Sequence, residues 1–197
     1  MLNVPVDAQT LSQAVAVIRG WLARGDKRYV STCTVYTVMA AQDDPAVMRA
    51  LRQADMVTAD GMPLVWLQRA GGFSDAGRVY GPDLFLALCQ QTASAGVRHY
   101  FLGGAPGVAD KLIAALHERF PDLTVSGSFA PKVSDTAAVD PHLVERINAA
   151  QADVVWVGLG SPKQDLWMCQ YRPLLDAPLL IGIGAAFDFV AGTKRQA

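Results

Sequence analysis

The stretch HYFLGGAPGVADKLIAALHERF, residues 99–120, contains the parts of one strand–turn–helix unit. The run from His99 to Leu102 is typical of a buried strand, and the turn after it contains Gly103, Gly104 and Gly107. Apolar residues then recur at every fourth position until a proline ends the pattern, which predicts an amphipathic helix. A short strand followed by a glycine-rich turn and a helix is the repeating unit of a parallel sheet.

The rest of the chain repeats this alternation of helices with short apolar runs. We expect helices at about Leu11–Ala23, from Asp43-Asp44-Pro45 to Ala54, at Pro63–Gln68, Pro82–Ala95, Val108–Phe120 and Pro141–Ala150, and after Gln164 up to Tyr171. We expect strands at Tyr29–Thr34, Met56–Ala59, His99–Leu102, Leu123–Val125, Val154–Val157 and Leu179–Ile183, with an irregular loop at Phe129–Asp140. Since no linker or repeat is visible, the pattern predicts a single α/β domain over residues 1–197, with a mainly parallel sheet and helices on its faces.

Composition excludes several classes of protein. The chain of 197 residues is 51% hydrophobic and 18% charged, so intrinsic disorder is not expected. Its net charge of -1 argues against nucleic-acid binding driven by bulk charge. No apolar run is long enough to span a bilayer, and the N-terminus carries no export signal. The cysteines Cys33, Cys89 and Cys169 fit neither a disulfide framework nor a zinc site, so we expect core thiols in a reducing, cytoplasmic compartment.

Glycine-rich turns follow three of the expected strands, after Leu102, Val157 and Ile183. In an open parallel sheet, ligands bind beyond the carboxyl ends of the strands, where glycines let the backbone approach a phosphate. A phosphorylated ligand is therefore a reasonable expectation, although any one of these turns could simply be a tight turn. The candidate nucleotide-binding glycines are Gly103, Gly104, Gly107, Gly158 and Gly160.

The common nucleotide and hydrolase motifs are absent. Leu102 occupies the first glycine position of a dinucleotide fingerprint, and the next strand ends without an acidic residue. The sequence contains neither a GxxxxGK[ST] loop nor a GxSxG elbow, and its histidines are not spaced as metal ligands. A dehydrogenase or a P-loop enzyme is poorly supported.

Four polar residues near the expected strand ends are candidates for chemistry. Asp60 follows an apolar run and precedes a glycine, so its carboxylate could be a general base or simply a turn residue. Asp188 lies between two phenylalanines and needs a partner, which could be a ligand or a backbone group. Arg78 could pair with a diphosphate or be a solvated loop charge. Gln164 could bind a sugar hydroxyl or cap a helix.

Taken together, five motifs resemble those of the WecG/TagA/CpsF family of glycosyltransferases, in the same order and over nearly the whole chain. They are Asp60-Gly61-Met62-Pro63, Arg78-Val79-Tyr80-Gly81-Pro82-Asp83-Leu84, Phe101-Leu102-Gly103-Gly104-Ala105-Pro106-Gly107, Gly158-Leu159-Gly160-Ser161-Pro162-Lys163-Gln164 and Gly182-Ile183-Gly184-Ala185-Ala186-Phe187-Asp188-Phe189-Val190-Ala191-Gly192. Any one motif is weak, whereas five in order are specific.

The resemblance implies a Rossmann-like α/β fold of the GT-E type, distinct from the two large glycosyltransferase superfolds. It implies an inverting transferase that moves a hexose from a UDP-sugar to a sugar on undecaprenyl diphosphate, for a cell-surface polysaccharide or exopolysaccharide. By position, Asp60 would be the general base, and Thr34, Arg78 and Gln164 would lie around donor and acceptor. No DxD motif is visible, so no metal and no cofactor are expected. The implied location is the cytoplasmic face of the membrane.

Two features depart from the family pattern. Tyr36 stands where the family usually has an asparagine after Thr34, so UDP-glucose, UDP-N-acetylmannosamine and its uronate all remain candidate donors. Asp165 stands where a glutamate usually follows Gln164. Family members also continue for about fifty more residues, a length that would add two or three helices.

That arginine-bearing tail is held to contact the membrane and to help complete the site. We therefore expect a chain without the membrane-associating tail to bind UDP but to turn over poorly. Apolar residues left exposed without the tail could promote self-association into a homo-oligomer. A nucleotide-sugar-binding module without catalysis is the alternative function.

Overall fold

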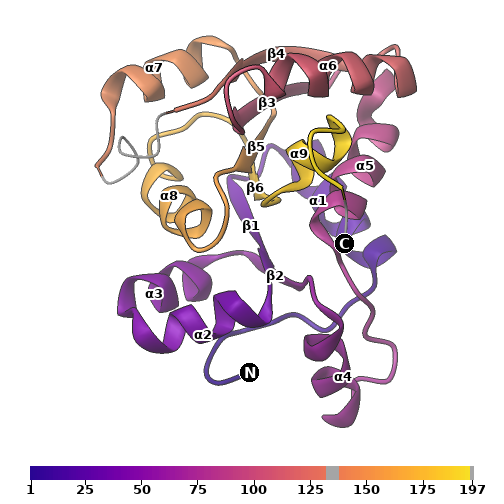
Figure 1. Ribbon diagram of the computed structural model, residues 1–197, viewed down its shortest axis with the longest axis vertical. Helices are drawn as coiled ribbons and strands as arrows, with labels where there is room; N and C mark the ends of the chain where they lie inside the picture. The colour runs from indigo at the N-terminus through magenta and orange to yellow at the C-terminus, as the bar shows by residue number, and fades with distance from the viewer. Residues whose placement is uncertain (132–137, 196–197) are drawn as a thin grey trace.

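The computed structural model describes residues 1–131 and 138–195. Its six strands form one parallel sheet in the order β2-β1-β6-β5-β3-β4 (Figure 1). The strands are β1 Arg28–Cys33, β2 Met56–Ala59, β3 Arg98–Gly103, β4 Thr124–Phe129, β5 Val154–Gly158 and β6 Leu179–Gly182. Every strand in the middle of this sheet is almost fully buried, as expected for parallel strands covered on both faces.

Helices cover both faces of the sheet, which confirms the expected α/β, Rossmann-like fold. They are α1 Leu11–Arg24, α2 Val35–Asp43, α3 Pro45–Gln53, α4 Met62–Ala70, α5 Gly81–Thr92, α6 Val108–Arg119, α7 Pro141–Ala149, α8 Lys163–Tyr171 and α9 Ala186–Val190, with a 3₁₀ turn at Ala93–Ala95. One apolar core joins α1, α5, α6 and α9 to the sheet, and a second joins α7 and α8 to the other face. A third core joins α2, α3 and α4 to the β1–β2 end.

Most expected elements are confirmed, and three expectations were wrong or incomplete. Residues 35–43 form the unexpected helix α2, and α9 occupies the turn expected after the last strand. Strand β4 continues to Phe129, where an irregular loop was expected to begin, and residues 132–137 of that loop lie outside the described residues. Of the cysteines, Cys33 and Cys89 are buried, whereas Cys169 is only half-buried.

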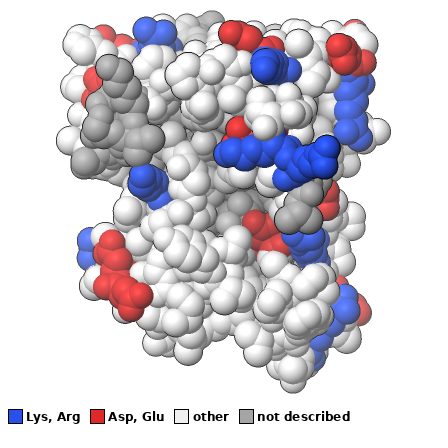
Figure 2. All heavy atoms as spheres, viewed as in Figure 1, with Lys and Arg blue, Asp and Glu red and all other residues white. Residues whose placement is uncertain are grey.

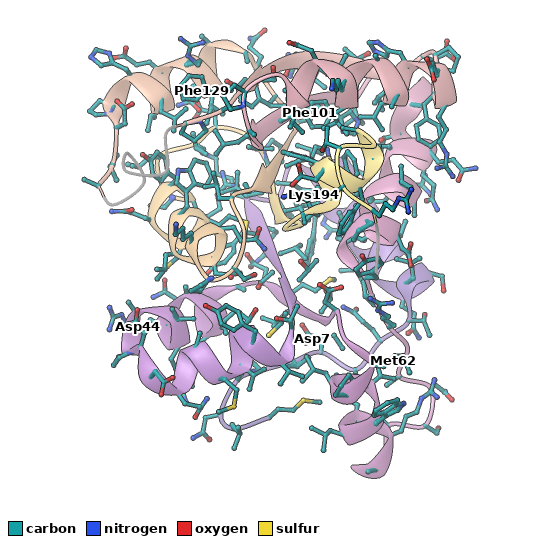
Figure 3. All side chains as sticks on the ribbon, in the orientation of Figure 1. Asp7, Asp44, Met62, Phe101, Phe129 and Lys194 are labelled. Atoms are coloured by element: carbon teal, nitrogen blue, oxygen red, sulfur yellow. The ribbon has the colours of Figure 1, made fainter. Side chains whose placement is uncertain are left out.

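The N-terminal segment covers the outer edge of the sheet. Asp7 forms an isolated parallel bridge with Thr58 of β2, and its carboxylate accepts a hydrogen bond from the Val57 N–H at 2.7 Å. Figure 3 shows Asp7 in the lower half of the view, near β2. The segment therefore pairs an edge that would otherwise expose backbone donors and acceptors.

A buried histidine links the central strands to α5. The Trp156 indole donates to His99 Nδ1 at 2.9 Å, so the other ring nitrogen, Nε2, carries the proton that faces Thr92 Oγ1 at 3.1 Å. Thr92 Oγ1 in turn donates to the Leu88 carbonyl at 2.6 Å. Burial lowers the pKa of His99 from 6.5 to about 4, so the ring is neutral in the folded protein.

This histidine should make stability depend on pH. Because its folded pKa lies below its unfolded value of 6.5, the unfolded chain binds the extra proton and stability falls as pH drops from 6.5 toward about 4. His99→Phe should lose that pH dependence. It should also lower the free energy of unfolding by about 1–3 kcal/mol at neutral pH, because Trp156 and Thr92 lose their hydrogen-bond partner. Urea unfolding at several pH values measures both effects. The exposed His142, changed in the same way, is the control, and an unchanged pH slope in His99→Phe would contradict the assignment.

Candidate active site

The carboxyl ends of five strands bring the candidate residues to one edge of the sheet. In the register, Cys33 of β1 pairs with Ala59 of β2, and Gly103 of β3 pairs with Gly158 of β5. The residues that follow these strand ends therefore lie along one edge. In open α/β sheets this is the edge at which ligands bind.

The glycine-rich turns surround a cavity of about 350 Å³ at this edge. Lining residues come from the turns after β3, β5 and β6, from α9, and from segments on either side: Gly104, Ala105, Pro131, Gly158, Leu159, Gly160, Gly184, Ala185, Asp188 and Lys194. Gly103 is buried beneath the cavity, and Gly107 is the N-cap of α6, outside the lining. Figure 2 shows the hollowed face between the upper and lower halves of the molecule.

Asp60 is half-buried directly after β2, and its side chain contacts the start of α5. Its Oδ1 accepts a hydrogen bond from the Gly81 N–H at 3.2 Å. Gly81 packs closely on the backbone of Ile183, because a Cβ there would lie 3.0 Å from the Ile183 carbonyl oxygen. Asp60 is therefore linked through Gly81 to the end of β6, where the turn that lines the cavity begins, but Asp60 itself does not line the cavity.

Burial makes the Asp60 carboxylate more basic than an exposed aspartate. Burial raises its pKa from 3.8 to about 6, although the Gly81 hydrogen bond and the Arg78 charge act in the opposite direction. A carboxylate with this pKa is ionised at neutral pH and is more basic than an exposed one.

Arg78 is fixed beside Asp60 through the backbone. Its Nε donates to the Asp60 carbonyl at 2.6 Å, and its guanidinium lies over the Tyr80 ring at 3.9 Å. The other guanidinium nitrogens have no hydrogen bond to a described protein atom, and the residue is exposed. The arrangement orients a cation next to the carboxylate, where an anionic substrate could reach it.

Thr34 and Tyr36 occupy the start of α2. Thr34 is its N-cap, and its Oγ1 accepts a hydrogen bond from the Thr37 N–H at 3.2 Å. The Tyr36 side chain is 64% exposed on the first turn of the helix. Both residues therefore lie at the strand end expected from the sequence, one as a helix cap and the other open to solvent.

Gln164 supports the turn after β6. The side chain is fully buried, its Oε1 accepts from the Gly184 N–H at 2.9 Å, and its Nε2 donates to Ser161 Oγ at 3.3 Å. Gly182 makes room for this amide, because a Cβ there would lie 3.0 Å from Gln164 Nε2. In this arrangement Gln164 holds two turns of the cavity together, and contact with a sugar hydroxyl stays a prediction.

Asp188 holds a lysine that the sequence reasoning did not identify. Lys194 Nζ lies 2.7 Å from Asp188 Oδ2, and Thr193 Oγ1 donates to Asp188 Oδ1 at 2.9 Å. The backbone N–H groups of Thr193 and Lys194 also donate to the Asp188 carbonyl. Figure 3 shows Lys194 against α9 in the middle of the molecule. These contacts place a cation among the glycine turns.

A second acidic residue is buried beneath the same edge. Asp165 is fully buried, and its Oδ1 accepts a hydrogen bond from Ser31 Oγ at 2.5 Å. Burial raises the pKa of Asp165 to about 6. Unlike Asp60, it has no exposed surface, so it links α8 to β1 rather than facing a substrate.

A second cavity, of about 380 Å³, lies at the opposite edge. Its lining includes Val97, Asp153 and Pro178, which immediately precede β3, β5 and β6. Although this cavity is slightly larger, it lies where the strands begin. The cavity at the carboxyl edge is the better candidate, because it adjoins the glycine turns and Asp60.

Comparisons with known proteins agree with the motifs. The glycosyl transferase WecG/TagA/CpsF family profile matches residues 1–197. An N-acetylglucosaminyldiphosphoundecaprenol N-acetyl-beta-D-mannosaminyltransferase of Bacillus spizizenii (strain ATCC 23059 / NRRL B-14472 / W23) is 26% identical over 192 residues, which cover 98% of this chain and 73% of the relative. None of the described helices is both long and apolar enough to cross a bilayer. The chain belongs to the WecG/TagA/CpsF family of glycosyltransferases.

Proposed function

We propose that this glycosyltransferase moves a hexose from a UDP-sugar to a sugar carried on undecaprenyl diphosphate, at the inner face of the cytoplasmic membrane. The observation that carries the proposal is the half-buried Asp60 carboxylate next to a glycine-lined cavity that also contains Lys194. The name of the Bacillus relative supports a lipid-diphosphate acceptor and makes UDP-N-acetylmannosamine the first donor to test. UDP-glucose and the mannosamine uronate are the comparison donors, because Tyr36 differs from the family pattern.

The reaction requires one base and one stabilised leaving group. Asp60 takes the proton of the acceptor hydroxyl, and the hydroxyl oxygen forms a bond to the anomeric carbon of the donor. The bond from that carbon to the phosphate oxygen breaks, and UDP leaves with the electron pair. A single displacement on an α-linked donor inverts the anomeric carbon, which fits the β linkage in the name of the relative.

Groups from several strand ends are proposed to bind the donor and the acceptor. The glycine turns let its diphosphate approach the backbone N–H groups. Lys194 supplies a positive charge that offsets the developing charge on UDP. Asp188 accepts hydrogen bonds from the ribose, and Arg78, Thr34 and Tyr36 surround the sugar and the acceptor. The buried Gln164 supports the turns beside them, and it contacts a sugar hydroxyl only if its amide exchanges one of its present partners.

The function is tested by UDP release. The protein is incubated with each UDP-sugar and a short-chain lipid-diphosphate N-acetylglucosamine acceptor, and acceptor-dependent UDP release is expected with at least one donor. A thermal-shift comparison should show stabilisation by UDP and not by NAD, since a ligand that binds only the folded state raises its stability. Stabilisation by NAD with no effect of UDP would reject the proposal.

Lys194→Met should weaken UDP binding by about 10- to 100-fold, because a hydrogen bond to a charged group contributes about 1.5–3 kcal/mol. Uridine, which lacks the diphosphate, should bind the variant and the original protein equally. Lys163→Met is the matched control, because Lys163 is an exposed lysine at the start of α8 that does not line the cavity. Calorimetric titration measures these affinities. An equal loss of uridine affinity would contradict a role at the diphosphate.

A further inference from the structure

Asp165 is the only fully buried acidic side chain among the described residues, and the proposed reaction does not use it. It lies in the first turn of α8, directly after Gln164. Its Oδ1 accepts the hydrogen bond from Ser31 Oγ at 2.5 Å, whereas its Oδ2 accepts none from a described residue. A buried carboxylate oxygen without a partner destabilises the fold, and an apolar side chain would avoid that cost. Stability alone therefore does not account for an acid at this position.

Two serine side chains contact this carboxylate, one from the sheet and one from a turn beside the cavity. Ser31 belongs to β1 and is fully buried. Ser161 lies in the turn between β5 and α8, and its contact with Asp165 acts against the rise in pKa that burial causes. This second contact is weaker than a hydrogen bond, since Oδ2 has no full partner. Asp165 therefore connects β1 to the turn after β5.

The turn after β5 is connected in the same way to the turn after β6. Gln164 Nε2 donates to Ser161 Oγ at 3.3 Å, and Gln164 Oε1 accepts from the Gly184 N–H at 2.9 Å. Gly160, which precedes Ser161, and Gly184 both line the candidate cavity. A series of contacts therefore runs from β1 through Asp165, Ser161 and Gln164, and it ends at two of the turns that form the cavity.

The charge of Asp165 sets the direction of these hydrogen bonds. Its pKa of about 6 leaves the carboxylate ionised at neutral pH, and an ionised carboxylate only accepts hydrogen bonds. Hydroxyl groups beside it therefore turn their protons toward it, which leaves the lone pairs of Ser161 Oγ for the Gln164 amide nitrogen. The amide oxygen then faces the Gly184 N–H. A reversed Gln164 amide would set its own N–H groups against that N–H.

We propose that Asp165 is a positioning residue that orients Ser161 and the Gln164 amide, and so sets the turns after β5 and β6 for the diphosphate of the donor. The inference rests on the proposed function, because the ligand of these turns is taken to be the UDP-sugar. Asp165 has no exposed surface, so it acts on the donor through the two side chains that it orients.

Asp165→Asn keeps the shape of the side chain, removes its charge and adds two N–H donors. The hydroxyl groups of Ser31 and Ser161 then no longer have to point toward residue 165. The variant should raise the KM for the UDP-sugar about tenfold, which corresponds to the contribution of about one hydrogen bond. The KM for the lipid-linked acceptor should not change, because Asp60 is held by Gly81 and lies outside this series of contacts. Calorimetric titration with UDP should show the same tenfold loss of affinity.

Two neighbouring residues of β1 provide a matched pair of variants. Ser31→Ala removes the hydroxyl that holds Asp165, whereas Thr32→Val removes an equally buried hydroxyl that donates to the Gly182 carbonyl at 2.8 Å. Only Ser31→Ala should raise the donor KM, although each variant loses one buried hydrogen bond. Because Ser31 and Asp165 act in series, the variant with both changes should lose no more donor affinity than the weaker-binding single variant.

Two results would overturn the proposal. Asp165→Asn could bind UDP as tightly as the original protein, or Thr32→Val could lose as much donor affinity as Ser31→Ala; either would mean that these contacts only stabilise the fold. Urea unfolding verifies that each variant is folded, and if Asp165→Asn does not fold, the comparison of Ser31→Ala with Thr32→Val decides alone. Absence of UDP binding in the original protein would instead reject the proposed function, so the two failures are distinguishable.

Discussion

Replacing Asp60 with Asn should lower turnover by about 10²- to 10⁴-fold, the usual contribution of a positioned general base. The amide keeps nearly the same size and can still accept a hydrogen bond from the Gly81 N–H. Affinity for UDP should therefore change little, because Asp60 is proposed to act on the acceptor hydroxyl and not on the nucleotide. Initial rates of UDP release and calorimetric UDP titration check the two parts of this expectation.

The pH dependence of activity is a second test of Asp60 as the base. Because burial raises the pKa of Asp60 to about 6, activity should increase as pH rises through that value and the base becomes ionised. Asp165 also has a pKa of about 6, so the profile alone does not identify the base. Asp110→Asn is the control, since Asp110 is an exposed acid in the first turn of α6 and is not among the charges that shift the pKa of Asp60. Full activity in Asp60→Asn would remove Asp60 as the base.

Gly103→Ala should destabilise the protein by about 2–4 kcal/mol and weaken UDP binding, because it combines backbone strain with overpacking. Gly103 has φ +119°, and a Cβ there would lie 2.4 Å from the Gly158 carbonyl oxygen. Relief of that clash would separate β3 from β5 where their turns form the floor of the cavity. Urea unfolding and UDP titration measure the two losses.

Gly160→Ala is the matched control for this change. Gly160 also has a positive φ, +77°, but a Cβ at this position meets nothing within 4 Å. This variant should lose only about 1–2 kcal/mol of unfolding free energy, which is the cost of placing alanine in the left-handed backbone conformation. If the Gly103 and Gly160 variants were equally stable, the close approach of the two strands would not be the reason for the glycine.

Helix caps and apolar periodicity predicted most of the fold. The Thr10–Gln13 capping box and the Asp44-Pro45 start were identified correctly, because both signals are local. Helix α2 was missed, since its buried and exposed sides are both largely apolar and its periodicity is weak. The Thr34–Thr37 capping pair was the local signal that could have revealed it.

The candidate site was predictable where it depends on strand ends. Asp60 and the glycine turns lie along one edge because parallel strands end together, which the sequence pattern implies. The Lys194 contact depends on how the segment after α9 folds back onto Asp188, and no motif indicates that. The Ser31–Asp165 hydrogen bond joins residues 134 positions apart, so local sequence signals cannot predict it.

A crystal structure with a bound UDP-sugar tests the central claim most directly. The account predicts the diphosphate over the turns after β3, β5 and β6, within reach of Lys194, with the anomeric carbon on the side that faces Asp60. A nucleotide in the cavity lined by Val97, Asp153 and Pro178, at the edge where the strands begin, would contradict the account.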